Sequence, residues 1–146
     1  MKKYRAIRVI SYILFWSLCL ASIATCHSVI VENKIDQKIS IQASNARLFA
    51  HIRGADSLAP ILLYLHGGPG SPLGVPILKA YAGPQLEEHV IMVYLHQRGI
   101  MKSSRVPDST HTVDHYVRDL SYVVEYLQQR FKDRRIYLLG HSWGGL

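Results

Sequence analysis

Residues 135–145 read RIYLLGHSWGG, a short apolar run that leads directly into the pattern G-x-S-x-G. Residues 135–139 have the length and composition of a buried strand. A chain that reverses sharply after such a strand holds its central residue in a strained backbone conformation, and side chains at the flanking positions would clash. We therefore predict that Ser142 is a catalytic nucleophile held above the sheet edge. The turn that presents it, the nucleophile elbow, consists of Gly140, His141 and Gly144.

A second glycine-rich loop follows an earlier apolar run. Residues 60–65 (PILLYL) are continuously apolar, as in a parallel strand covered on both faces, and lead into HGGPG at residues 66–70. Glycines here let backbone N–H groups point into one cavity, which an oxyanion hole requires when charge develops on a carbonyl oxygen. We predict that this hole is formed by Gly67, Gly68 and Trp143. A phosphate-binding loop fits less well, since no Lys-Ser/Thr follows and G-x-G-x-x-G is absent.

The other segments alternate between strand and helix patterns. Residues 113–131 carry apolar side chains at a 3.6-residue period, and Thr112 can cap the start of this predicted helix. A helix over residues 75–86 is interrupted by proline and glycine. Further strands are predicted over residues 38–44, 47–53 and 90–95. Strands that alternate with helices indicate an α/β fold with a mostly parallel sheet and flanking helices.

The chain has 146 residues, of which 49% are apolar, enough for one modest domain. Its formal net charge is +7. Removing the four bases among the first eight residues, which carry no acid, leaves +3 for the rest. We therefore expect no nucleic-acid partner. Both cysteines, Cys19 and Cys26, also precede residue 27, so neither a disulfide framework nor a cysteine metal cluster is expected in the body.

Residues 1–26 are predicted to be a signal peptide or an N-terminal membrane anchor, followed by one domain over residues 27–146. A basic start precedes a 12-residue apolar run at residues 9–20, and small residues follow it. Cleavage before Thr25 fits the small-x-small rule.

Two alternatives to a cleaved signal stay open. Residues 9–25 would serve as an uncleaved anchor that contacts the membrane, or Cys26 would be lipidated, because residues 23–26 resemble a bacterial lipobox. The cleaved signal, the anchor and the lipidated cysteine all predict that the domain over residues 27–146 is exported, either to the periplasm or out of the cell.

Three motifs, in this order and spacing, resemble the α/β-hydrolase fold and more narrowly the proline iminopeptidase-like serine peptidases of family S33. Each follows a predicted strand: HGGPG, then HQRGIMKSS at residues 96–104, then GHSWGG. The resemblance covers roughly residues 40–146. It implies that Ser142 is the nucleophile, that Gly68 or Gly67 forms the oxyanion hole with Trp143, and that residues 97–99 support the site. It also implies an aminopeptidase that forms an acyl-enzyme on a peptide or a small ester or amide, with no metal and no organic cofactor.

His96 stands where the family usually has Asp. The fold places its strand two positions from that of Ser142, about 10 Å away, too far for a direct hydrogen bond of about 3 Å. We therefore do not expect His96 to be the catalytic base. His66 is interpreted as a structural loop residue. His111 and His115 are interpreted as flanking the start of a helix remote from the strand ends.

In this fold the catalytic Asp or Glu and then the His follow the nucleophile in the chain, whereas this sequence ends at Leu146. We therefore expect an α/β-hydrolase domain truncated after the nucleophile elbow. Three hypotheses on function stay open: a serine aminopeptidase of proline iminopeptidase type, an esterase or lipase of the same fold, and an inactive fragment that lacks the catalytic Asp and His. The oligomeric state is not predicted.

Overall fold

The computed structural model describes residues 34–71 and 73–146. The signal peptide or anchor over residues 1–26, with the alternative of lipidation at Cys26, lies outside the described residues and stays a prediction. Within the described part, no helix is both long and apolar enough to cross a membrane.

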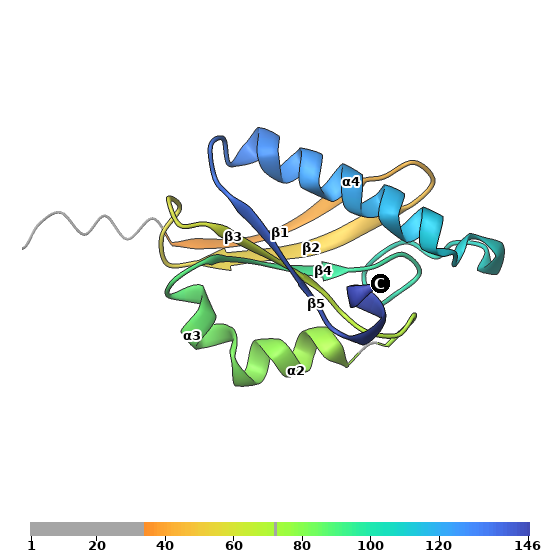
Figure 1. Cartoon of the computed structure of the whole chain (residues 1–146), viewed down its shortest axis with the longest axis horizontal. Helices are drawn as coiled ribbons and strands as arrows, with labels where there is room; N and C mark the ends of the chain where they lie inside the picture. The colour runs from red at the N-terminus through yellow and green to blue at the C-terminus, as the bar shows by residue number, and fades with distance from the viewer. Residues whose placement is uncertain (1–33, 72) are drawn as a thin grey trace, which may run out of the picture. The chain divides into compact units, whose positions relative to one another are not determined.

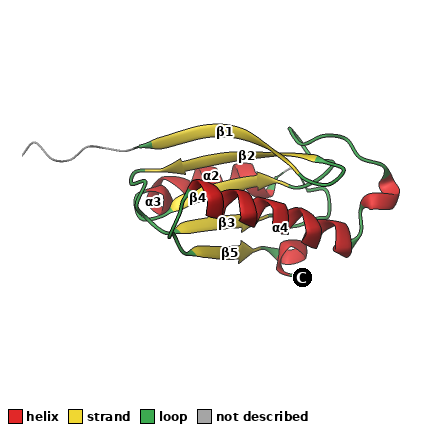
Figure 2. Cartoon of the chain, turned by 90° about the horizontal axis from the view of Figure 1, so that it is seen from above, coloured by secondary structure: helices red, strands yellow, loops and turns green. Residues whose placement is uncertain are grey.

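Five strands form one mixed sheet in the order β1-β2-β4-β3-β5 (Figures 1 and 2). The strands that carry the predicted motifs, β4, β3 and β5, are parallel to one another, while β1 and β2 add antiparallel pairs. The strand bounds are β1 Ile35–Gln42, β2 Arg47–Gly54, β3 Ile61–Leu65, β4 Ile91–His96 and β5 Ile136–Gly140. The predicted strands are therefore confirmed, and the parallel arrangement holds for the three that bear the motifs.

Helices cover both faces of this sheet (Figure 1). The long helix α4 (Val113–Arg130) packs on one face, where Val123 and Leu127 are fully buried. On the other face α2 (Gly74–Tyr81) and α3 (Gly83–Glu87) cover a smaller cluster around Tyr94. The chain thus forms the layered α/β arrangement that alternating strands and helices predict.

The two predicted helices differ in how closely the structure follows them. Thr112 caps α4 as expected, because its hydroxyl accepts a hydrogen bond from the backbone N–H of His115 at 3.4 Å. The interrupted pattern over residues 75–86 gives two short helices that meet at Ala82. Pro84 lies in the first turn of α3, where its missing N–H costs no hydrogen bond.

Strand β5 lies at one edge of the sheet, while β4 is buried along its whole length. Side chains on both faces of β5 are exposed: Tyr137 by 49%, Leu138 by 53% and Leu139 by 37%. The apolar composition of β5 predicts a strand covered on both faces. In the structure β5 is instead an edge strand with exposed apolar side chains.

Candidate active site

Strands β3 and β5 pair directly, which brings the two glycine-rich loops together. Leu65 at the end of β3 stands opposite Gly140 at the end of β5. The pairing continues past the strand, because the backbone N–H of His141 donates to the carbonyl of Leu65 at 3.0 Å. HGGPG and the nucleophile elbow therefore leave the sheet side by side at the carboxyl ends of neighbouring parallel strands, the edge where open α/β sheets bind ligands.

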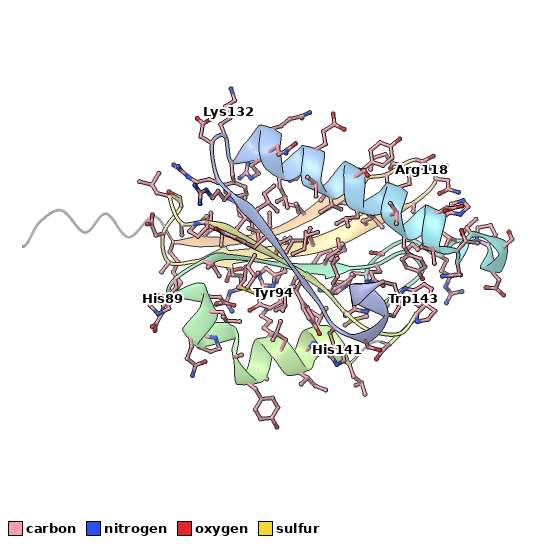
Figure 3. All side chains as sticks on the ribbon, in the orientation of Figure 1. His89, Tyr94, Arg118, Lys132, His141 and Trp143 are labelled. Carbon is pink, nitrogen blue, oxygen red and sulfur yellow. The ribbon has the colours of Figure 1, made fainter. Side chains whose placement is uncertain are left out.

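The elbow has the strained geometry that its sequence predicts. Ser142 has φ of 52°, in the left-handed region that residues with a side chain rarely adopt, and it is exposed at the start of the short 3-10 helix η2 (Ser142–Gly145). A Cβ at Gly140 would lie 2.5 Å from the carbonyl oxygen of Gly144. A Cβ at Gly144 would lie 2.1 Å from the carbonyl oxygen of Leu65. Both positions therefore accept only glycine. Figure 3 shows His141 and Trp143 flanking this turn.

The HGGPG loop lies against the serine. A Cβ at Gly67 would lie 3.2 Å from the Cβ of Ser142 and 3.0 Å from Nδ1 of His141, so the absence of a side chain at Gly67 lets the loop approach. The His141 ring packs on this loop. Among the described residues, no carbonyl accepts a hydrogen bond from the backbone N–H of Gly67, Gly68 or Trp143. Donors without an internal partner, next to an exposed hydroxyl, are what an oxyanion hole requires.

His66 holds the HGGPG loop in place. The side chain is 1% exposed, and burial lowers the pKa of His66, which keeps the imidazole neutral. Its Nδ1 donates to the carbonyl of Gly67 at 2.8 Å, while its Nε2 accepts from the backbone N–H of Gln97 at 3.3 Å. The Gln97 side chain in turn donates to the His66 carbonyl at 3.0 Å. His66 is therefore a structural residue, as the sequence predicts, and it ties the loops after β3 and β4 together.

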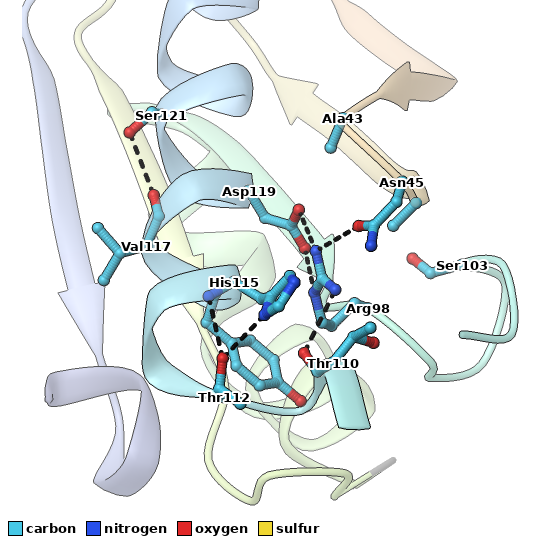
Figure 4. A network of polar contacts seen from close by, with 12 residues as sticks. Ala43, Asn45, Arg98, Ser103, Thr110, Thr112, His115, Val117, Asp119 and Ser121 are labelled. Carbon is cyan, nitrogen blue, oxygen red and sulfur yellow. Dashed lines mark hydrogen bonds and ion pairs between the residues drawn. The ribbon is translucent and has the colours of Figure 1, made fainter. Parts of the chain in front are cut away.

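A buried ion pair fixes the loop after β4 to α4 (Figure 4). The Arg98 guanidinium, 1% exposed, donates to both carboxylate oxygens of Asp119 at 2.7 and 2.8 Å. It also donates to the carbonyl of Thr110 and to the side chain of Asn45. Asp119 belongs to none of the three sequence motifs. Its position, three residues after Tyr116 and four before Val123 on the apolar face of α4, is a signal for a buried, paired carboxylate.

The ring of Trp143 is held by α4. It lies edge-on to Tyr116, with ring centroids 5.7 Å apart and an interplanar angle of 79°. Both side chains line an apolar cavity of about 310 Å³ between α4 and β5, together with Val117, Leu138 and Leu146. Packing of the ring in this position fixes the backbone whose N–H is the second predicted oxyanion donor.

His96 does not hydrogen bond to Ser142 and is not placed to act as its general base. The sheet order puts β4 two positions from β5, as predicted, and the ring packs 4.8 Å from that of Phe49. Burial, followed by nearby positive groups, lowers the pKa of His96 to about 4, so the ring is neutral and weakly basic. In the part of the chain that the structure describes, no side chain hydrogen bonds to the hydroxyl of Ser142.

The depressed pKa of His96 predicts a loss of stability in acid. Unfolding would expose the ring and return its pKa towards 6.5, so the unfolded chain binds the proton first as the pH falls. The contribution of His96 to the free energy of unfolding is therefore fully present above pH 6.5. It is lost as the pH drops towards 4, and the loss is on the order of 2 kcal/mol. Denaturant titrations at pH 7.5 and 4.5 measure it. His96→Asn is the control, because Asn keeps an acceptor for the Lys102 N–H and does not titrate; an equal pH dependence in both proteins would contradict the assignment.

The interpretation of His111 as remote from the strand ends is wrong. Its ring packs against Gly99 in the loop after β4, where a Cβ would lie 2.7 Å from Cε1. The hydrogen bond from Arg98 to the Thr110 carbonyl holds the segment before α4 against the loop that follows β4. Helix periodicity cannot reveal this, because His111 precedes the helix and is placed by a buried contact far along the chain. His115 stays at the start of α4, hydrogen-bonded to Thr112.

Comparison with known proteins agrees with this geometry. The family described as alpha/beta hydrolase fold matches residues 60–146, more than half of the chain. The probable aminopeptidase YbaC of Bacillus subtilis (strain 168) is 33% identical over 108 residues, which make up 73% of this chain and 33% of that protein.

Solved structures show the same arrangement. The proline iminopeptidase-related protein TTHA1809 from Thermus thermophilus superposes with a TM-score of 0.62 and 28% identity, over 75% of this chain and 37% of that one. The epoxide hydrolase VrEH1 from Vigna radiata gives a TM-score of 0.56 at 19% identity, over 75% and 32% of the two chains, a likeness of fold alone. The chain spans about a third of the length of the curated relative it matches.

Proposed function

The chain belongs to the α/β-hydrolase fold family, and from this membership we propose that it carries the nucleophile and oxyanion hole of a serine hydrolase of aminopeptidase type. One observation carries the proposal: the exposed Ser142, at φ of 52°, lies against Gly67 in a loop whose backbone N–H groups have no carbonyl partner among the described residues. A hydroxyl and free N–H donors on neighbouring strand ends are the two parts that attack on a carbonyl needs.

The reaction follows from these two parts. The Ser142 oxygen attacks the carbonyl carbon of the substrate's N-terminal residue, and the carbonyl oxygen takes up negative charge. The N–H groups of Gly67 or Gly68 and of Trp143 donate to that oxygen. The C–N bond then breaks, the amine leaves with a proton, and an acyl-enzyme remains until water hydrolyses it. A general base must take the serine proton, and none of the described histidines contacts the hydroxyl.

Peptides are the substrates we favour over simple esters. The relative from Bacillus subtilis is named a probable aminopeptidase, and the structure from Thermus thermophilus a proline iminopeptidase-related protein. The HGGPG and GHSWGG motifs support the same class. The oxyanion hole by itself would serve an ester as well as an amide, so an esterase or lipase is the alternative, decided by comparing rates on a prolyl amide and a short acyl ester.

Covalent labelling tests the nucleophile. We expect a fluorophosphonate probe to label the full product of the gene that encodes this chain, with the label on Ser142 and none in Ser142→Ala. Ser121→Ala is the matched control, because this serine is exposed on α4 and donates its hydroxyl to the carbonyl of Val117, and its loss should leave labelling intact. Absence of labelling on Ser142 in the folded product, or label that persists in Ser142→Ala, would overturn the proposal.

The same measurement tests the inactive-fragment hypothesis. The lack of a described base beside Ser142 and the open apolar edge of β5 favour it for these residues taken alone. It predicts that residues 28–146, prepared alone, neither react with the probe nor unfold cooperatively. Labelling of that preparation would contradict it.

A further inference from the structure

A second cavity opens beside the oxyanion loop. Its volume is about 440 Å³. It is lined by Pro69, Gly70, Gly99, Ile100, Met101 and His111. These residues come from three places: the loop after β3, the loop after β4, and the segment before α4. Pro69 directly follows Gly68, so one wall of the cavity belongs to the same loop as the proposed oxyanion hole.

The imidazole of His111 is fixed on two sides of this cavity. Its Nδ1 lies 2.9 Å from the hydroxyl of Tyr116, and its Cε1–Nε2 edge lies beside Gly99, where a Cβ would be 3.1 Å from Nε2. Tyr116 in turn packs on Trp143. A phenol O–H is a strong donor and a weak acceptor, whereas an unprotonated imidazole nitrogen accepts strongly. Tyr116 therefore donates to Nδ1, and His111 carries its proton on Nε2.

The Nε2–H of His111 has no hydrogen-bond partner among the described residues. Among the described residues that line the cavity, His111 is the only one with a side-chain N–H donor, and it stands beside the apolar side chains of Ile100 and Met101. Met101 adds a separate sign of constraint. Its φ is 49°, a left-handed conformation that is costly for a residue with a side chain, and the side chain is 51% exposed. Strain of this kind persists where the surroundings impose it, most often at functional sites.

The donor and the apolar wall together match one part of a peptide. The residue on the leaving side of the scissile bond has a side chain and a further carbonyl oxygen. The N-terminal residue of an aminopeptidase substrate has a side chain and an ammonium group, and Nε2–H cannot accept from an ammonium.

We propose that this cavity is the subsite for the leaving-side residue, whose carbonyl accepts from His111 Nε2–H and whose apolar side chain packs on Ile100 and Met101. The proposal rests on the proposed aminopeptidase function. It makes peptides better substrates than aminoacyl anilides, which have no carbonyl at this position.

Kinetics of the full gene product test the subsite. A dipeptide amide and an anilide with the same N-terminal residue are compared in the unmodified protein, His111→Ala and His111→Gln. In His111→Ala we expect kcat/KM for the dipeptide to fall about tenfold more than kcat/KM for the anilide, mainly through KM. His111→Gln keeps an N–H donor and should recover most of the loss. A fall of equal size for both substrates, or no fall, would overturn the assignment.

Met101→Gly tests the apolar wall without weakening the fold. Glycine accepts the left-handed backbone, so the melting temperature should not fall. The ratio of kcat/KM for a peptide with leucine at the leaving-side position to that for a peptide with glycine there should drop about fivefold. An unchanged ratio would show that Met101 does not contact the leaving-side residue.

Binding separates failure of the subsite from failure of the proposed function. The uncleaved dipeptide amide is titrated into Ser142→Ala, alone and combined with His111→Ala, and weaker binding of the double variant supports the subsite without any turnover. If the probe labels Ser142 and His111→Ala does not weaken peptide binding, only the subsite is overturned. If Ser142 does not label and the peptide does not bind, both proposals fall.

Discussion

Asp119→Ala is expected to lower the free energy of unfolding by about 3–5 kcal/mol, a large share of the total for a domain of this size. The substitution removes both carboxylate oxygens from Arg98. Among the described residues, it leaves a guanidinium that is 1% exposed with only the Thr110 carbonyl and the Asn45 side chain as partners. A buried charge without its counterion keeps its desolvation cost and loses the attraction that offset it. Urea denaturation followed by circular dichroism measures the loss.

Asp114→Ala is the matched control for this prediction. Asp114 lies in the first turn of α4, where a negative charge favours the helix dipole, and its side chain is exposed and has no hydrogen bond or ion pair with another described residue. Its removal should therefore cost less than about 1 kcal/mol. Equal losses in the two variants would show that the carboxylate of Asp119 acts through the helix rather than through Arg98.

The ion pair also bears on the site. Arg98 directly follows Gln97, whose backbone N–H donates to His66, and His66 holds the carbonyl of Gly67. Any Asp119→Ala protein that still folds should therefore label more slowly at Ser142.

Gly144→Ala is expected to disrupt the site and the end of the sheet together. The new Cβ would lie 2.1 Å from the carbonyl oxygen of Leu65 and 2.9 Å from that of His66, and both atoms belong to the backbone of the neighbouring strand and its loop. Neither can rotate away as a side chain can, so β3 and β5 must separate where the HGGPG loop meets the turn at Ser142. We expect a loss of about 3 kcal/mol in unfolding free energy and at least a tenfold fall in the rate of labelling at Ser142.

Gly145→Ala provides the comparison one residue further on. A Cβ there would have a single neighbour, the carbonyl oxygen of Gly140 at 3.9 Å, an ordinary contact. Its unfolding free energy should stay within about 0.5 kcal/mol of the parent protein. Thermal melts and labelling rates of the two alanine variants, measured side by side, test this prediction. Equal stability and equal labelling of both variants would show that the turn accommodates a Cβ at residue 144.

The local features of this protein follow from its sequence alone. Apolar runs, glycine-rich loops and the 3.6-residue period of α4 are properties of neighbouring residues, and each predicts its element within a few positions. The strain at Ser142 and the need for glycine at 140 and 144 also follow, because a sharp turn imposes them on any chain.

Contacts between distant residues needed the tertiary structure. The approach of Gly67 to Ser142, the pairing of Arg98 with Asp119 across 21 positions, and the placement of His111 beside Gly99 join segments that no local pattern relates. Each depends on the order of strands in the sheet and on which buried polar groups find partners, and these are settled by the packing of the whole domain. The sequence by itself therefore determined the sharp turn and predicted Ser142 as its nucleophile, while only the folded domain decided which side chains surround this turn, because burial and charge pairing act through space rather than along the chain.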